Sequence, residues 1–222
     1  PDSVTSIENS AFEWCTSLKN ITIPDSVTSI GNCAFFNCTS LTSITIPNSV
    51  TNIEDWAFQT CTSLISVTIP DGVTSIKSHA FYRCESLTAV TIPKSVTSIG
   101  DYAFSECTSL TEIIVDSNNE SYTSKDGILF DKNLETVICC PGGKAGSFTI
   151  PDSVTSIGTY AFYKCTSLTD VTIPDGVTCI GDWVFAYCEK LTSVTIPDSV
   201  TSIGDSAFVG CSSLTEIIVS SG

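Results

Sequence analysis

The sequence contains no methionine, only one histidine and few basic residues. Among 222 residues, 24 are acidic and 9 are basic, which gives a formal net charge of -15. A surface this acidic repels nucleic acid and anionic membranes, which bind through clustered lysine and arginine. No stretch reaches the roughly 20 apolar residues of a membrane-spanning helix. The composition therefore predicts neither nucleic acid binding nor membrane insertion, and it leaves basic or neutral partners open.

The residue combinations of common catalytic and metal sites are also missing. His79 is the single imidazole, so a convincing Ser-His-Asp or Cys-His set cannot be assembled. Zinc sites typically use C-x₂-C pairs or paired histidines, and neither occurs. There is no Gly-rich phosphate loop. We therefore expect no catalytic residue, no metal and no cofactor, and an enzyme centred on residues 116–150 is only a remote alternative.

What the chain does have is a repeat, visible as four residue types that recur in one register every 23 residues. The step is interrupted once, between Pro93 and Pro151. A fixed period of this length is the signature of a solenoid, in which each coil packs only on its neighbours. The four columns are Pro1, Pro24, Pro47, Pro70, Pro93, Pro151, Pro174 and Pro197; Phe12, Phe35, Phe58, Phe81, Phe104, Phe162, Phe185 and Phe208; Cys15, Cys38, Cys61, Cys84, Cys107, Cys165, Cys188 and Cys211; and Leu18, Leu41, Leu64, Leu87, Leu110, Leu168, Leu191 and Leu214.

One repeat unit predicts two short strands, a proline turn and an inward-facing turn. Ile21 and Ile23 alternate with Thr22, which is the pattern of a strand with one buried face. Pro24 has no N–H to donate and ends that strand, and the following Asp favours a turn. Residues 27–30 predict a second extended segment. In residues 34–38 the apolar spacing suits one helical turn facing the core.

The unit resembles the BspA-like class of leucine-rich repeats. The matching stretches are L-T-S-I-T-I-P at residues 41–47, V-T-S-I-G at 96–100 and A-F-S-E-C at 103–107. The resemblance covers nearly the whole chain. It implies a right-handed, curved solenoid with a parallel β-sheet of first strands on the concave side, and second short strands and short helical turns on the outer side. It also implies a secreted or cell-surface protein that binds host or neighbouring-cell proteins.

The chain is expected to form a single solenoid over residues 1–222. Residues 1–115 hold five regular repeats, residues 116–150 form an atypical 35-residue repeat, and residues 151–222 hold three more regular repeats. Residues 127–130 and 134–138 are apolar runs around a polar turn, which predicts a β-hairpin. Such an insertion either adds strands to the sheet or protrudes, and its role is structural or one of binding. Because the pattern starts at Pro1 and stops at Gly222 without polar caps, we expect a fragment of a longer protein.

The eight in-phase cysteines predict an inward ladder of buried thiols. Neighbouring rungs lie ~4.8 Å apart, within disulfide range, but stacked side chains point in parallel and do not face each other. Free buried cysteine behaves as a small hydrophobic residue. Cys33, Cys139, Cys140 and Cys179 are out of phase. Cys33 and Cys179 are expected at exposed positions, where a disulfide between chains is conceivable.

Two sets of columns are candidates for recognition of a partner. The first is polar and lies on the first strand: Thr22, Thr45, Thr68, Thr91, Thr172 and Thr195, with Ser43, Ser66, Asp170 and Ser193 beside them. The second is aromatic and flanks the A-F pair: Trp56, Tyr102, Tyr160 and Trp183, with His79 in the same column, and Trp14, Tyr82, Tyr163 and Tyr187 just after the Phe. Aromatic residues that escape packing are frequent binding hot spots. The competing interpretation is that these rings merely cover the outer turns.

These observations predict a non-enzymatic protein-binding or adhesion module that engages an extracellular protein or glycoprotein over many rungs. An extended solenoid surface suits a large ligand. A purely structural spacer or stalk is the main alternative, favoured by the near identity of the rungs. Ice binding is a minor one, suggested by the threonine columns. The partner and the oligomeric state stay open at this level.

Overall fold

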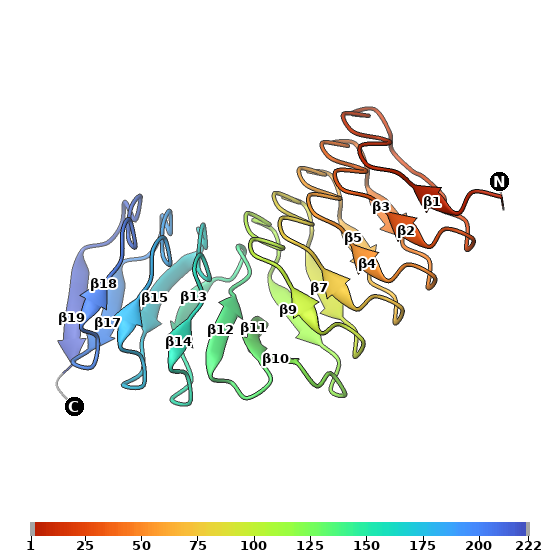
Figure 1. Cartoon of the computed structure of the whole chain (residues 1–222). Coiled ribbons are helices and arrows are strands. Elements are labelled where there is room, and N and C mark those ends of the chain that lie inside the picture. Colours follow the sequence, from red (N-terminus) through yellow and green to blue (C-terminus); the bar gives the residue numbers. More distant parts are fainter. Residues whose placement is uncertain (1–2, 221–222) are drawn as a thin grey trace.

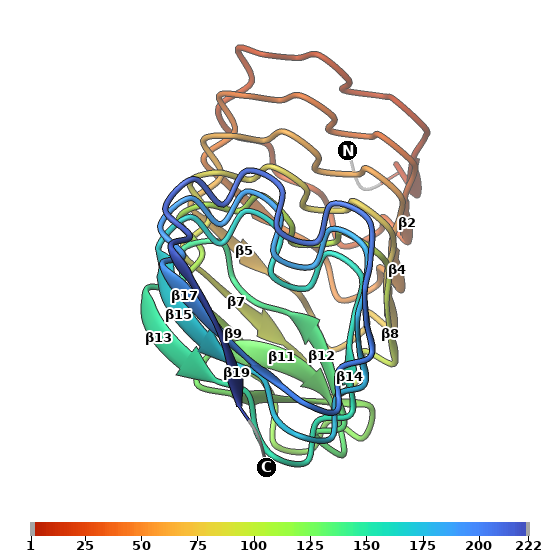
Figure 2. The same ribbon diagram turned by 90° about the vertical axis from the view of Figure 1, so that its left-hand side faces the viewer.

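The computed structural model describes residues 3–220, which form strands and turns wound into one stack of coils (Figure 1). No helix occurs among these residues. Along the stack, the coils superimpose, with the first strands on one side and the second strands on the other (Figure 2). Pro1 and Gly222, on which the expectation of a fragment rests, lie outside the described residues. A parallel solenoid built on a 23-residue repeat is thus confirmed.

The first strands form the side of the stack that is here named the first-strand face. They pair in parallel with like residues side by side, for example Ser43 with Ser66 and Thr45 with Thr68. Ile44 between them is buried, as the period-2 pattern predicts. The first repeat is an exception, because no strand is assigned at residues 18–23. The strands are β3 (Ser43–Thr45), β5 (Ser66–Thr68), β7 (Ala89–Ile92), β9 (Glu112–Val115), β13 (Gly146–Thr149), β15 (Leu168–Thr172), β17 (Ser193–Pro197) and β19 (Glu216–Ser220).

The second extended segment is a two-residue strand in every regular repeat. Each pairs in parallel with its counterpart, so that Ile7 lies beside Ile30 and Ile76 beside Ile99. These strands are short because the proline turn comes before them and the next bend follows directly after them. The strands are β1 (Ser6–Ile7), β2 (Ser29–Ile30), β4 (Asn52–Ile53), β6 (Ser75–Ile76), β8 (Ser98–Ile99), β14 (Ser156–Ile157), β16 (Cys179–Ile180) and β18 (Ser202–Ile203).

The prediction of a helical turn around the A-F pair is wrong in its geometry. The residue two before Phe and the residue two after it have positive φ, for example Trp56 at 58° and Thr60 at 60°. Such residues cannot continue a right-handed helix. Backbone N–H groups therefore alternate in direction: Cys38 bonds back to Phe35 within its own turn, whereas Phe35 bonds across to Ala57 in the next rung. The segment, here called the turn side, is a chain of turns joined by an inter-rung ladder.

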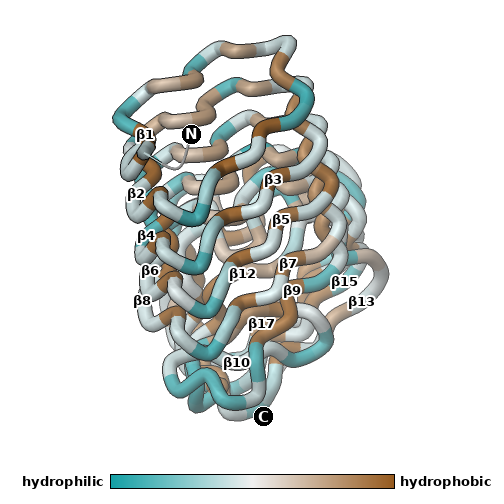
Figure 3. Tube along the Cα trace, turned by 90° about the vertical axis from the view of Figure 1, so that its right-hand side faces the viewer, coloured by the Kyte–Doolittle hydropathy of each residue, from teal (hydrophilic) through white to brown (hydrophobic). Residues whose placement is uncertain are grey.

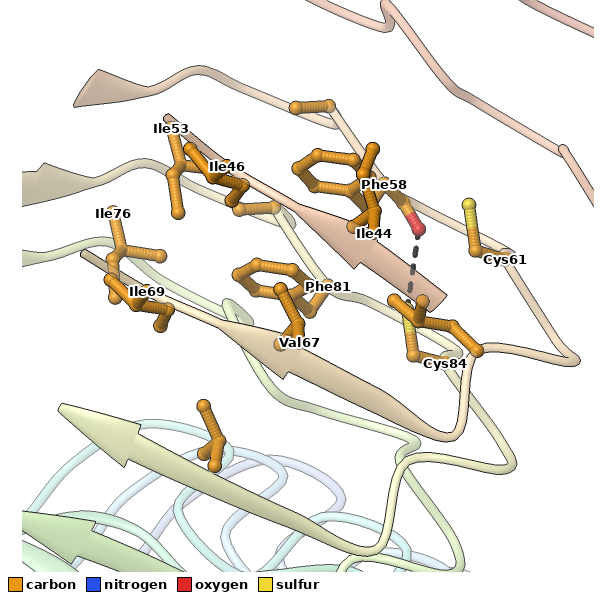
Figure 4. Close-up of a cluster of buried hydrophobic side chains, with 14 of the residues drawn as sticks. Ile44, Ile46, Ile53, Phe58, Cys61, Val67, Ile69, Ile76, Phe81 and Cys84 are labelled. Atoms are coloured by element: carbon orange, nitrogen blue, oxygen red, sulfur yellow. Dashed lines mark hydrogen bonds between the residues drawn. The ribbon is translucent and has the colours of Figure 1, made fainter. Parts of the chain in front are cut away.

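The core is a set of continuous columns along the stack, as the repeat predicts. Apolar residues of successive rungs align in Figure 3. Phe58 and Phe81 are fully buried and stack with ring centroids 5.3 Å apart and planes within 6° of parallel. Figure 4 shows these rings beside the isoleucines of both strands. Burying each such ring contributes about 1.5–3 kcal/mol, which is repeated at every rung.

The cysteine ladder points inward and carries hydrogen bonds as well. The Cys84 thiol donates to the Phe58 carbonyl at 3.3 Å, the dashed line in Figure 4, and Cys61 donates likewise to Phe35. All twelve cysteines are free. Six of the eight in-phase thiols are buried; in the end rungs, Cys15 is exposed and Cys211 is half-buried. Of the out-of-phase pair expected at the surface, Cys179 is exposed and Cys33 is half-buried.

The atypical repeat forms the predicted hairpin and adds a strand that was not expected. β11 (Ile128–Asp131) pairs antiparallel with β12 (Thr136–Cys139), and β10 (Tyr122–Lys125) pairs antiparallel with β11. β12 then pairs in parallel with β14, so the second-strand ladder resumes there. The turn between β10 and β11 is Asp126-Gly127, both with positive φ. Asp-Gly is a common signal for such a turn, and it is the clue in the sequence to β10.

The insertion lies within the stack and divides its core in two. Leu129 packs into the N-terminal core, whereas its neighbours Ile128 and Phe130 pack into the C-terminal core. The stack changes direction near these strands (Figure 1). Asn119 attaches the insertion to the preceding rung: fully buried, it donates to the carbonyls of Pro93 and Val96 and accepts from the N–H groups of Ser121 and Tyr122.

Candidate functional site

Five rings of one column lie on one another along the turn side and are here named the aromatic ladder: Trp56, His79, Tyr102, Tyr160 and Trp183. Successive centroids are 6.0, 4.6, 4.3 and 6.2 Å apart. Every member has φ between 58° and 61°, so each side chain leaves the backbone in the same direction. Trp56 is 41% exposed and the other four are half-buried. Each ring therefore packs against its neighbours in the column and still remains partly accessible to solvent.

Two further rings, Tyr82 and Tyr163, lie three residues after His79 and Tyr160 and close a hollow against the ladder. Tyr82 meets His79 edge-on at 5.4 Å, and Tyr163 meets Tyr160 edge-on at 5.5 Å. The intervening rung has the small residue Ser105 at the same position. The result is a hollow of about 300 Å³, here named the aromatic hollow, whose lining is His79, Tyr82, Tyr102, Tyr160, Tyr163 and Trp183.

A charge network borders the aromatic hollow. Glu106 is buried, with a side chain 8% exposed, and its carboxylate lies 2.8 Å from the Lys164 ammonium and 3.5 Å from the Arg83 guanidinium. Tyr82 donates its hydroxyl to the same carboxylate. Lys164 also lies over the rings of Tyr163 and Tyr187, at 5.6 and 5.9 Å. A buried carboxylate needs such partners, because an unpaired one is strongly disfavoured.

The surroundings favour the uncharged forms of three rings that line the hollow, His79, Tyr82 and Tyr102. Burial, and then the hydrogen bond to Glu106, raises the pKa of Tyr82, so its hydroxyl stays a donor. Burial and the neighbouring Tyr160 raise the pKa of Tyr102. Burial lowers the pKa of His79, against the opposing effect of Asp55 and Asp101. The Nδ1 atom of His79 is buried without a hydrogen-bond partner. The hollow thus presents neutral rings rather than ions.

The surface continues without interruption over the insertion. Tyr102 and Tyr160 are 58 positions apart in the sequence, yet their rings are the closest pair of the ladder. Glu106 and Lys164, likewise 58 positions apart, form the shortest of the three ion pairs found in residues 3–220. On the turn side, the regular rungs before and after the insertion, rung five (with Phe104) and rung six (with Phe162), therefore lie in register and in side-chain contact.

The polar columns predicted for recognition lie on the first-strand face. Thr22, Thr45, Thr68, Thr91 and Thr172 are exposed, and Thr195 is half-buried. Ser43 and Ser66 are also exposed. Asp170 accepts hydrogen bonds from Ser193 at 2.6 Å and Thr169 at 2.7 Å, which lower the pKa of its carboxyl. Two of the predicted residues, Asp170 and Ser193, are thus bonded to each other.

The sequence places all five ladder rings in one column, with Tyr82 and Tyr163 among the rings just after the Phe, but the charge network was not predicted. The signal for the network was present: Arg83, Glu106 and Lys164 occupy the same repeat position in three successive regular rungs, with alternating charge. Charges that stack at rung spacing pair or repel, and alternation favours pairing.

Two further properties bear on function. Within residues 3–220, no group of three or more His, Cys, Asp or Glu side chains is arranged to hold a metal ion. None of the described residues forms a helix long and apolar enough to cross a membrane.

Parallel coils with columns of Leu, Ile, Phe and Cys inside and variable side chains outside define the chain as a leucine-rich-repeat solenoid. More narrowly, it belongs to the BspA-type leucine-rich-repeat family, whose family model matches residues 5–126 and 139–222 in six copies. A search of curated proteins finds no match to the chain.

Solved structures of bacterial leucine-rich-repeat proteins resemble this chain. A leucine-rich cell surface protein from Faecalibacterium prausnitzii is 36% identical, over 98% of this chain and 70% of that one, with a TM-score of 0.67. A leucine-rich-repeat protein from Eubacterium ventriosum is 29% identical, over 99% and 67%, with a TM-score of 0.82. The pneumococcal vaccine antigen PcpA, 23% identical over 97% and 67%, shares the fold with a TM-score of 0.77.

Proposed function

We propose that this chain is a non-enzymatic binding module of a secreted or cell-surface protein, and that it engages an extracellular protein or glycoprotein through the turn side. The observation that supports this most is the aromatic hollow, whose six lining residues are all aromatic. Tyrosine and tryptophan are enriched at binding hot spots because they bury large areas while losing little side-chain entropy. A similar bacterial protein is described as a cell surface protein, which supports the location.

The packing of the rings favours this use over a mere covering of the turns. A ring that only covered the backbone would be replaceable by an aliphatic side chain, and the phenylalanines of the core already seal the turn from inside. The ladder instead combines close ring stacking with half-exposed faces, which holds the rings in place before a partner arrives. Such preorganisation reduces the entropy lost on binding.

The first-strand face is the other predicted recognition surface, and the same experiment tests it. Its threonine and serine side chains are small and exposed, so they are suited to polar contacts over a broad area. We assign it a secondary role, because hydroxyl side chains rarely dominate the energy of an interface.

The test is binding of the purified chain to a panel of immobilised extracellular matrix proteins and glycoproteins. Tyr102, Tyr160 and Trp183 are replaced by Ser, the residue that occurs naturally at this repeat position in Ser10 and Ser206. A matched variant replaces Thr45, Thr68 and Thr91 by Ala. We expect the serine variant to weaken binding by at least about tenfold, and the alanine variant by less.

A spacer or stalk is the competing function, favoured by the near identity of the regular rungs. Under that function no member of the panel binds the wild-type chain above background. Binding that survives both variants would place the contact surface elsewhere on the solenoid.

A further inference from the structure

A cleft lies between the two halves of the stack, beneath the Tyr102–Tyr160 contact. Its volume is about 330 Å³. One wall is rung five at residues 99–105, the other is rung six at residues 158–160, and the base is Ile138 and Cys139 of the insertion. Residues 138–140 of the insertion pass through the stack at this level, but the insertion has no A-F-x-x-C turn of its own. One turn segment is therefore missing from an otherwise regular series.

The missing segment leaves backbone donors without acceptors. In six regular rungs the Phe N–H donates to the alanine-position carbonyl of the next rung, at 2.8–3.0 Å: Phe12, Phe35, Phe58, Phe81, Phe162 and Phe185. In rung five the corresponding N–H of Phe104, and those of Tyr102 and Glu106 on either side, have no acceptor among the described residues. Tyr102 and Phe104 line the cleft, and by the geometry of the other rungs their N–H groups face it.

The opposite wall carries the complementary groups. The Ala161 carbonyl accepts from Cys140 N–H at 2.7 Å, so the insertion satisfies the middle acceptor. The Thr159 carbonyl, which in other rungs accepts from the preceding rung as Ser78 does from Trp56, has no donor among the described residues. The cleft thus has unpaired N–H groups on one side and an unpaired C=O on the other.

An extended peptide matches this arrangement, since its carbonyl and N–H groups point to its two edges in turn. Phe104 is buried, and a buried N–H group without a partner is costly, so a ligand that pairs it gains more than it would at an ordinary surface. We infer that the cleft accepts an extended segment of a protein partner, which hydrogen-bonds through its backbone to Tyr102, Phe104 and Thr159. This is the β-augmentation mode of peptide recognition.

The size and charge of the cleft narrow the chemistry of the segment. A volume of about 330 Å³ is at the lower end for ligand pockets, so the segment has small side chains where it enters. Asp101 lines the cleft and is exposed, and the chain has a net charge of -15. The flanking residues of the segment are therefore neutral or basic. The inference rests on the proposed function, because it concerns how a protein partner is bound.

The experiment selects peptides from an unconstrained phage-displayed library on the immobilised wild-type chain, and the enriched sequences are then synthesised. Cys139→Phe fills the cleft, and Cys179→Phe is the matched control, since Cys179 is an exposed cysteine on β16. The expected result is a loss of peptide affinity of about tenfold or more in Cys139→Phe and no loss in Cys179→Phe. N-methylation of the central peptide amides should have the same effect as Cys139→Phe.

Backbone amide exchange on the wild-type chain gives a second readout that does not depend on how Cys139→Phe folds. In the free chain the amides of Tyr102 and Phe104 should exchange faster than those of Phe58 and Phe81. The selected peptide should slow the first pair only. Peptides that bind Cys139→Phe as tightly as wild type, or a library in which none slows Tyr102 and Phe104, would show that the cleft holds only water.

The two proposals can fail separately. If the serine variant of the aromatic ladder loses its matrix partner while Cys139→Phe keeps it, the proposed function stands and the cleft inference is wrong. If wild type binds no panel member but the selected peptides meet every expectation above, the cleft is a peptide site on a module whose turn side is not an adhesion surface.

Discussion

The Lys164 ammonium lies 2.8 Å from the Glu106 carboxylate across the insertion, so that rungs five and six are joined by an ion pair on the turn side. Arg83 approaches the same carboxylate from rung four. Three successive regular rungs are thereby connected by side chains at the place where the backbone ladder is interrupted. The contact stands in for the hydrogen bonds that the missing turn segment would have made.

Removing the Glu106 charge should destabilise the junction. Glu106→Gln leaves Lys164 without a counter-ion and Arg83 with Glu85 alone, but both cations are partly exposed and regain water. We expect a loss of about 1–2 kcal/mol in the free energy of unfolding. Chemical denaturation measures it, with Glu85→Gln as control, because the Glu85 side chain is 44% exposed and its loss should cost less than about 0.5 kcal/mol. Equal costs for the two variants would contradict this role.

Shortening a core phenylalanine should open the stack. Phe58 is fully buried and has a stacked ring on each side, Phe35 and Phe81, both at 5.3 Å. Phe58→Ala is expected to cost about 3–5 kcal/mol, because the transfer free energy is lost and a cavity remains. Thermal and chemical unfolding report the loss. Phe36→Ala, at a half-buried position, should cost clearly less; a wild-type melting curve for Phe58→Ala would refute the column model of the core.

Asn119 should be a sensitive position despite its polarity. Asn119→Leu removes a side chain that makes four hydrogen bonds to backbone groups in a fully buried site. Leaving those groups unpaired should cost about 2–4 kcal/mol. Equilibrium unfolding gives the value, and Asn118→Leu at the adjacent exposed position is the control. If the two variants unfold alike, the insertion is held to rung five by its apolar contacts alone.

The buried thiols predict alkaline destabilisation. Burial raises the pKa of Cys107 from an ordinary 9.0 to about 12, and it raises the pKa of Cys61 as well. Because the folded state favours the neutral thiol, its contribution is complete below the unfolded pKa and is lost as pH rises through the folded one. Stability should fall from about pH 9 upward, by about 1 kcal/mol for Cys107 at about pH 10.

Denaturant unfolding between about pH 8 and pH 10 checks this dependence. Cys107→Ala should flatten the decline, whereas Cys179→Ser, which removes an exposed thiol, should leave it unchanged. A stability that is constant over this range would show that the thiols are reached by solvent.

The sequence by itself determined the repeat, the identity of the core columns and the strands at each end of the proline turn. These follow from local rules. Side chains alternate with a period of two along a strand, proline cannot donate a backbone hydrogen bond, and a 23-residue repeat places identical residue types side by side in neighbouring rungs. The inward cysteines and the hairpin at residues 127–138 followed from the same patterns. One column of the candidate site, which holds Trp56, His79, Tyr102, Tyr160 and Trp183, was visible because its residues vary between rungs whereas the core columns barely vary.

Only the tertiary structure decided how the turn side is built and which side chains are in contact across the insertion. The apolar spacing of residues 34–38 suits a helical turn as well as it suits a ladder of turns, and positive φ at two positions per rung selects the ladder. Contacts between Tyr102 and Tyr160, or Glu106 and Lys164, depend on how the 35-residue unit fits within the stack. The cleft depends on which backbone groups find partners, and that is a property of two rungs meeting in space rather than of either one.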